Sequence, residues 1–194
     1  MRKLKLEVQL SLDGFAADIK GKTNWMIWDW QPKWNWDKEL RTFHTNLQTT
    51  SDTILLGKKM AVNGFFEHWQ QVAEDAKNPQ RTFANAIVGM KKYIFSKKLS
   101  KVRWENTEII NGNLNKEVNK LKKQKGKDII VYGGTSFVSS LIEEGLIDEY
   151  NLIINPTIIG KGKSIFKKIS SDRNLTLTDS KAYECGVVVL RYTK

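Results

Sequence analysis

The chain has 194 residues, of which 40% are hydrophobic and 27% are charged, and these proportions are ordinary for a soluble globular protein. No apolar run approaches the length needed to cross a bilayer, which excludes a protein with membrane-spanning helices. The net charge of +11 raises the hypothesis of nucleic-acid binding, but a solvated, lysine-rich surface is the interpretation we favour. A site for a small phosphorylated ligand would also use part of this charge.

The first segment, "MRKLKLEVQLSLDGF", alternates apolar and polar residues, which predicts a strand over residues 4–12 that ends at "DG". It lacks the unbroken apolar centre and the cleavage site of a signal peptide. The only cysteine, Cys185, lies in a strand-like segment, and no intrachain disulfide can form. These features predict a cytoplasmic protein, and the length suits a single domain over residues 1–194.

Strands and helices alternate along the rest of the chain. Leu40, Phe43 and Leu47 recur at helical spacing and predict an amphipathic helix over residues 37–50. The elements predicted after it are strand 53–57, helix 81–90, strand 92–96, helix 113–124, strand 128–132, helix 135–145, strand 149–156 and a hairpin within 174–193. This order predicts an α/β protein whose mostly parallel sheet is covered by helices on both faces.

Ligands of such sheets bind outside the carboxyl ends of the strands, and the residues that follow each strand are therefore candidate site residues. Gly57, Lys58 and Lys59 follow one predicted strand, and Ser96 and Lys97 follow another. Backbone N–H groups, hydroxyl groups and lysine cations all bind phosphate oxygens. Two strand ends of this kind indicate a phosphate-bearing ligand.

A third strand end carries two adjacent glycines, Gly133 and Gly134, before the helix that starts at Thr135. Bare backbone allows a ligand to approach closely, and a helix N-terminus favours a phosphate. The alternative is a tight strand-to-helix turn with an ordinary helix cap. Together with the other two strand ends, this one predicts an extended polyphosphate such as a dinucleotide, although the G-x-G-x-x-G fingerprint is absent.

Four segments in this order, "VQLSLDGFAAD", "ILLGKKM", "YIFSKKL" and "VYGGTSFVSSLIEEGLIDEYNLIINPTIIGKGKSIF", resemble the dihydrofolate-reductase-like superfamily. The resemblance is greatest to the reductase domain of the bifunctional riboflavin-biosynthesis deaminase-reductase and its stand-alone relatives. It implies a three-layer sandwich with a mixed, mostly parallel sheet of about eight strands, helices on both faces and a C-terminal hairpin. It also implies an NADPH cofactor and a homodimer.

The resemblance assigns residues to the cofactor by position. Gly57, Lys58 and Lys59 would contact its phosphates, and Ser96 and Lys97 would lie near the adenosine 2′-phosphate. The pyrophosphate would be held by Gly133, Gly134, Thr135, Ser136 and Phe137, and the loop next to the nicotinamide would contain Asp13, Gly14 and Ala17.

The sequence departs from the family pattern at three positions. Lys58 stands where arginine is usual, and Met60 stands where threonine is usual, so that a bidentate fork and a hydroxyl group are missing. Tyr132 stands where the riboflavin enzymes tend to have an acid immediately before the double glycine. We expect Tyr132 to contact the substrate.

Dihydrofolate reductase places an acid on the first helix after the opening strand, and Asp37 and Glu39 occupy the first turn of the corresponding helix here. We predict these two acids as catalytic residues, with Phe43 on the same helix face as Glu39 contacting the substrate. The alternative is that the acids only stabilise the helix dipole.

The segment "NWMIWDWQPKWNWD" holds five tryptophans, of which Trp25 lies nearest to the predicted nicotinamide loop. Trp25 is therefore the first candidate to stack on a planar substrate, whereas most of the others are expected to pack the loop against the body or form a dimer contact. His44 and His68 have no partner at a metal-ligand spacing, so no metal site is predicted and both are expected to be structural or exposed.

These observations predict an NADPH-dependent reductase of a small heterocyclic substrate. The first named activity is that of a 5-amino-6-(5-phosphoribosylamino)uracil reductase, and reduction of a dihydrofolate or another pterin is the next. The alternatives from other classes are a catalytically silent nucleotide-binding module of the same fold, and single-stranded nucleic-acid binding through tryptophans and lysines.

Overall fold

The computed structural model describes residues 1–27 and 35–194, and eight strands in it form one sheet. The strands of this sheet are β1 (Leu4–Leu10), β3 (Ser51–Gly57), β4 (Lys91–Phe95), β5 (Thr107–Ile110), β6 (Asp128–Val131), β7 (Glu149–Ile154), β9 (Thr176–Ala182) and β10 (Val188–Thr193). Two short strands, β2 (Ala17–Asp18) and β8 (Gly162–Lys163), pair separately. The helices are α1 (Lys38–Thr49), α2 (Lys58–Met60), α3 (Phe66–Glu74), α4 (Arg81–Gly89), α5 (Leu114–Lys122) and α6 (Thr135–Glu143), and a π-helical segment, η1 (Ala61–Phe65), joins α2 to α3.

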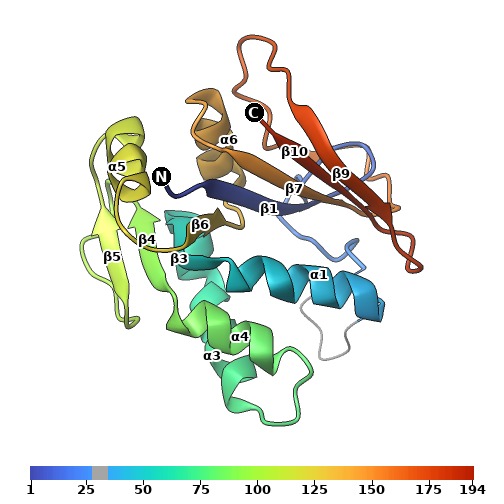
Figure 1. The fold of residues 1–194 in the computed structure, drawn as a ribbon, viewed down its shortest axis with the longest axis horizontal. Helices are drawn as coiled ribbons and strands as arrows, with labels where there is room; N and C mark the ends of the chain where they lie inside the picture. Colours follow the sequence, from blue (N-terminus) through green and yellow to red (C-terminus); the bar gives the residue numbers. More distant parts are fainter. Residues whose placement is uncertain (28–34) are drawn as a thin grey trace.

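The strand order in the sheet is β5-β4-β3-β6-β1-β7-β10-β9 (Figure 1). The first six strands in this order are parallel to their neighbours, and the C-terminal hairpin of β9 and β10 adds two antiparallel strands at the edge. Parallel neighbours need long crossover connections, and helices lie in these connections except in the one from β4 to β5. The prediction of a mixed, mostly parallel sheet with a terminal hairpin is confirmed.

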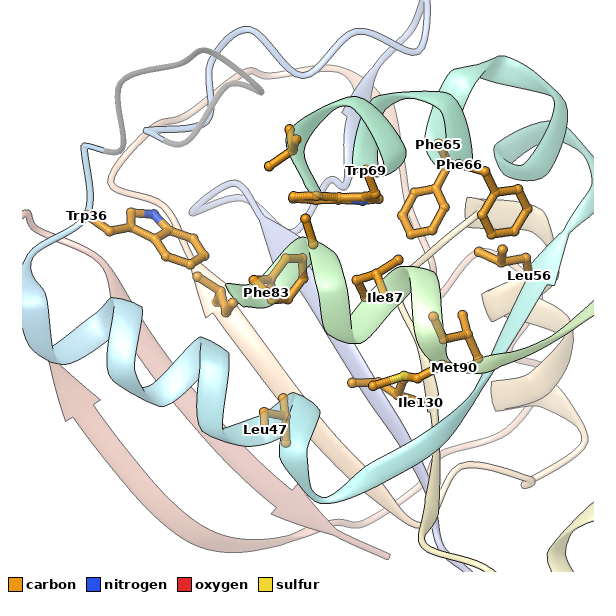
Figure 2. Packing of buried hydrophobic residues seen from close by; sticks show 14 of the residues in the cluster. Trp36, Leu47, Leu56, Phe65, Phe66, Trp69, Phe83, Ile87, Met90 and Ile130 are labelled. Atoms are coloured by element: carbon orange, nitrogen blue, oxygen red, sulfur yellow. The ribbon is translucent and has the colours of Figure 1, made fainter. Parts of the chain in front are cut away.

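Helices cover both faces of the sheet, and each face has its own apolar core. On one face, α1, α3 and α4 bury a cluster that is rich in aromatic residues. Figure 2 shows Phe65, Phe66 and Trp69 of the η1–α3 segment packed over Phe83 and Ile87 of α4. On the other face, α5 and α6 pack on leucine, isoleucine and valine side chains. Within the described residues, every helix is too short or too polar to cross a membrane.

β1 shows how one strand contributes to both faces. Its residues Leu4, Leu6, Val8 and Leu10 belong to the core under α5 and α6. Because successive side chains of a strand point to opposite faces, Glu7 points toward α1 instead. Leu6 and Val8, next to it in the sequence, are apolar, and the Glu7 side chain is only 3% exposed.

The predicted elements differ from the observed ones mainly at their ends. The first strand stops at Leu10 rather than at residue 12, because Gly14 N–H donates to Ser11 O at 2.9 Å and closes a turn. Gly145, with φ of +62°, ends α6 in a left-handed conformation, as its position after the helix predicted. The sequence analysis did not identify α3 or the edge strand β5.

Candidate functional site

A cleft of about 1250 Å³ opens at the carboxyl ends of β1, β3, β4 and β6. Its lining includes Val8 and Gln9 of β1, Gly57 of β3, Phe95 of β4 and the segment Tyr132 to Phe137 after β6. This cleft therefore lies where the residues after the strands predicted a site, at the carboxyl ends of the strands.

The ends of β3 and β6 approach each other so closely that glycine is required at Gly57. A Cβ atom at this residue would lie 2.8 Å from the Cβ of Phe137 in α6. Gly134, with φ of +80°, faces it from the other strand end, and a Cβ there would lie 3.7 Å from the Cα of Gly57. Two of the three predicted strand ends thus lie next to each other at the start of α6.

The N-terminus of α6 is open toward the cleft. Thr135 and Ser136 begin the helix and line the cavity, and no side chain of the described residues caps this end of the helix. The unpaired N–H groups and the positive end of the helix dipole favour an anion. Among the described lining residues there are also six lysines: Lys20, Lys58, Lys59, Lys163, Lys167 and Lys168.

The third predicted strand end is placed differently. Ser96 and Lys97 lie outside the set of described residues that line the cleft, and only Phe95, just before them, belongs to it. Ser96 Oγ accepts hydrogen bonds from the backbone N–H groups of Lys98 and Leu99, at 3.1 and 3.0 Å, and thereby holds the turn after β4. The structure therefore gives Ser96 a local role in the turn.

The side chain of Asp13 anchors the loop after β1. Asp13 accepts hydrogen bonds from the N–H groups of Ile159 and Gly160 at 3.2 and 2.7 Å. Together with the hydroxyl group of Ser11, these donors hold the pKa of Asp13 below its usual value. Ala17, which follows in the same loop, lines the cleft, whereas Asp13 and Gly14 support the loop from outside the lining.

The two acids predicted as catalytic residues, Asp37 and Glu39, lie outside the described lining of this cleft, and their catalytic role stays a prediction. Asp37 is the N-cap of α1, where its carboxylate accepts from Leu40 N–H at 2.9 Å. Glu39 is exposed and pairs with Lys181 at 2.7 Å on the outer surface. The physical reason is that the first turn of α1 points toward the C-terminal hairpin, so that the acids serve the helix and its contact with that hairpin.

Of the residues predicted to contact the substrate, Tyr132 lines the cleft. Phe43 packs against the aromatic core of the sheet face and lies outside the described lining. Trp25 also lies outside it, although its neighbours Thr23 and Met26 belong to the lining. Of the two described tryptophans of that segment, Trp36, which is fully buried, is the one that lines the cavity. Trp28, Trp30 and Trp34 are outside the described residues.

A buried polar network at the cleft was missed by the sequence analysis. Glu7 and His44 both line the cavity and are 3% and 2% exposed, and His44 Nδ1 contacts Glu7 Oε1. Gln48 Nε2 donates to the other oxygen of Glu7 at 2.9 Å. The hydroxyl group of Tyr132 donates to Gln48 Oε1. Burial, together with the charge of Glu7, holds the pKa of Tyr132 well above its usual value.

Aromatic rings surround this network. His44 stacks on Phe83, with ring centroids 4.2 Å apart. It also lies nearly perpendicular to the ring of Trp36, with ring centroids 5.1 Å apart. The ring centroids of Trp69 and Phe83 are 4.7 Å apart. Trp36, Trp69 and Phe83 all line the cavity. One signal in the sequence was available, because His44 and Gln48 are four residues apart and lie next to the apolar stripe of the helix.

Comparison with known proteins relates the whole chain to one family. The family model described as the RibD C-terminal domain matches residues 2–189. Two proteins of Bacillus subtilis (strain 168) are similar over nearly their whole length, and both are uncharacterized. YyaP is 34% identical over 98% of this chain and 94% of its own, and YwjB is 24% identical over 94% of this chain and 92% of its own.

Solved structures share the fold at lower sequence identity. A putative riboflavin biosynthesis protein from Shewanella sp. PV-4 is 18% identical with a TM-score of 0.70, over 100% of this chain and 98% of its own. A diaminohydroxyphosphoribosylaminopyrimidine deaminase/5-amino-6-(5-phosphoribosylamino)uracil reductase from Thermotoga maritima is 17% identical with a TM-score of 0.66. That match covers 99% of this chain and 56% of the Thermotoga protein.

Proposed function

Because the chain belongs to the family of the RibD C-terminal domain, we propose that it is an NADPH-dependent reductase of a small heterocycle. Reductase activity is what this family suggests, and the cofactor and the substrate are the parts that we add. The aminopyrimidine 5-amino-6-(5-phosphoribosylamino)uracil is the first substrate to test, because a similar structure carries that activity in its name.

The observation that carries the proposal is that the uncapped N-terminus of α6 and several lysine side chains line the same cleft. Gly57 and Gly134 leave bare backbone beside the start of α6, and Lys58 and Lys59 begin the helix that follows β3. This set of donors suits the two phosphate groups of a dinucleotide. It is also consistent with the resemblance that assigns these residues to the cofactor phosphates.

When bound, a reduced nicotinamide supplies a hydride, and the protein residues bind, orient and exclude water. The lysines and the N-terminus of α6 would hold the phosphates. The aromatic residues Trp36, Trp69 and Phe83 line the cavity and offer apolar surface to flat rings. Placing two flat rings next to each other in one cleft is the main contribution that this chain can make to the reaction.

The test has two stages. At an NADPH concentration of one hundred times Kd, binding should stabilise the folded chain by about 2.7 kcal/mol, which raises Tm by about 5–10 °C. Oxidation of NADPH is then followed with the aminouracil as substrate. Thermal melts with NADH in place of NADPH show whether the 2′-phosphate contributes to binding. If neither nucleotide raises Tm, the cofactor proposal is wrong.

One observation favours a second candidate, a nucleotide-binding module without turnover. Asp37 and Glu39, the acids expected to assist catalysis, lie outside the cleft. A silent module would show the thermal shift with NADPH but no oxidation of NADPH with any heterocycle offered. The two stages of the test therefore separate the two candidates.

The homodimer and the cytoplasmic location stay predictions. Sedimentation at several protein concentrations would decide the first, and fractionation of cells would decide the second.

A further inference from the structure

Exposed apolar side chains gather in two loops beside the cleft. Apart from the N-terminal methionine, seven large apolar residues are exposed in the described part of the chain, and four of them lie within residues 11–22 and 156–168. These four are Leu12, Ile19, Ile158 and Phe166. The first three are 62%, 66% and 70% exposed, more than any of the three that lie elsewhere. Single exposed apolar residues are normal, but a group of them marks an interaction site. We call residues 11–22 and 156–168 the loop patch.

Hydrogen bonds hold the two loops of the patch together. Leu12 N–H donates to Thr157 O at 2.8 Å, and the carboxylate of the next residue, Asp13, accepts from Gly160 N–H at 2.7 Å. Further along the same two loops, β2 pairs with β8. The exposed apolar side chains therefore belong to one piece of surface. Because these backbone N–H groups are already hydrogen-bonded, the neighbouring side chains can enter an apolar medium without leaving them unpaired.

The charge of the loop patch is strongly positive. The patch contains no arginine and six lysines, all of them exposed: Lys20, Lys22, Lys161, Lys163, Lys167 and Lys168. Its two acids are Asp13 and Asp18. The carboxylate of Asp18 accepts from Lys22 N–H at 2.8 Å, so that both acids are engaged with backbone N–H groups of the patch. An anionic partner therefore fits this surface.

Three kinds of partner can cover exposed apolar side chains, and charge and composition separate them here. A second copy of the chain would bring its own six lysines against the first six, and this repulsion opposes self-association through the patch. Protein interfaces are rich in arginine and poor in lysine, whereas every cation of the patch is a lysine. An anionic membrane surface attracts lysines, whose apolar stems can lie along the acyl boundary while the ammonium groups contact the head groups.

We propose that the loop patch docks the chain on an anionic membrane surface. Leu12, Ile19 and Ile158 enter the boundary between head groups and acyl chains, and the lysines contact the head groups. Stable peripheral binding combines an apolar anchor with a polybasic surface, and the patch has both. Four of its lysines also line the cleft, so that the docked membrane lies beside the mouth of the cleft. This inference does not depend on the proposed cofactor or substrate.

Sedimentation with vesicles tests the contribution of charge. The wild-type chain should sediment at low salt with vesicles of phosphatidylcholine and phosphatidylserine in a two-to-one mixture, but not with phosphatidylcholine alone. Lys22→Gln with Lys161→Gln removes the two lysines of the patch that lie outside the described lining of the cleft. This variant should bind the mixed vesicles about 10- to 30-fold more weakly. Lys116→Gln with Lys120→Gln removes the same charge from the exposed face of α5, and should weaken binding about threefold or less.

A second pair of variants tests the insertion of apolar side chains. Leu12→Gln with Ile158→Gln should weaken binding to the mixed vesicles about tenfold or more, because two apolar side chains lose their burial. Leu177→Gln with Val88→Gln is the control, since these two exposed residues lie in β9 and α4, outside the patch, and it should bind like the wild type. A thermal melt of each variant shows that it folds, and the lysine pairs decide the inference if the apolar variant does not.

Four results would overturn the inference. The first is a wild-type chain that does not sediment with the mixed vesicles at low salt. The second is an equal loss of binding in the two lysine pairs, because net charge alone would then explain the attraction. The third is unchanged binding by the folded apolar variant of the patch. The fourth is binding of the wild type to polyglutamate but not to vesicles, which would assign the patch to an acidic protein instead.

Discussion

Replacement of Gly57 by alanine tests the close approach of β3 and α6 at the end of the cleft that we propose for the cofactor. The new Cβ would lie 2.8 Å from the Cβ of Phe137. Relief to about 3.5 Å, where carbon atoms attract, requires a movement of about 0.7 Å. A change of rotamer does not help, because the Cβ of Phe137 is attached directly to the backbone of α6. The start of the helix itself must move.

The expected cost follows from this displacement. Overpacking of this kind destabilises a protein by about 1–3 kcal/mol, and each kcal/mol lowers Tm by about 2–4 °C in a domain of this size. Moving the N–H groups of α6 by about 0.7 Å turns a hydrogen bond of about 2.9 Å into a contact of about 3.6 Å, which is no longer a bond. Losing one such bond to a phosphate should weaken NADPH binding by about 10- to 100-fold.

Gly89→Ala is the control for Gly57→Ala. Gly89 is exposed at the end of α4, and a Cβ there has open space within 4 Å. This variant should gain about 0.4–1 kcal/mol through the unfolded state and bind NADPH like the wild type. Urea unfolding and calorimetric titration with NADPH measure both quantities. If Gly57→Ala binds NADPH with wild-type affinity and is as stable as Gly89→Ala, the argument from close approach is refuted.

Three further predictions concern single side chains. Lys58→Gln should weaken NADPH binding about tenfold at low salt, and the loss should shrink as salt screens the phosphate, which titrations at several ionic strengths would reveal. Tyr132→Phe should lower the free energy of unfolding by about 1–3 kcal/mol in urea, because Gln48 Oε1 loses its donor; an unchanged value would contradict the hydrogen bond. Burial lowers the pKa of Lys92 to about 8, so the folded state releases this proton before the unfolded state, whose lysine pKa is about 10.4. Stability of the wild type relative to Lys92→Met should therefore rise between about pH 8 and 10.4, by about 3 kcal/mol at most, and a flat difference in pH-dependent urea unfolding would refute this.

Local patterns predicted the elements that have a strong periodicity or a clear end signal. The alternating residues of β1, the apolar run of β6 and the glycine after α6 are examples. Among the elements that were missed, α3 and β5 lack such signals. The segment of α3 begins with aromatic residues and is preceded by a bend at Gly64, where φ is +90°. β5 has only four residues, none of them fully buried, and it forms because β4 offers an open edge.

The lining of the cleft was predicted in the part that depends on strand ends and missed in the part that depends on contacts across the fold. Gly57 and Gly134 could be found because parallel strands finish at one edge of a sheet. Trp36, rather than Trp25, reaches the cavity, and no local pattern distinguishes the two. Asp37 and Glu39 were predicted as catalytic acids from their place in the first turn of α1. In the structure this turn faces the C-terminal hairpin, and both side chains lie outside the lining of the cleft.

The sequence by itself thus determined the class of fold, the family and two of the strand ends that line the cleft, because these follow from periodicity and from motifs within short segments. Only the tertiary structure decided that Glu7 of β1 meets His44 and Gln48 of α1 at the cleft. The alternation of β1 shows which face Glu7 occupies, but it does not show what lies opposite. That contact depends on the packing of α1 over a strand that is 37 residues away in the sequence.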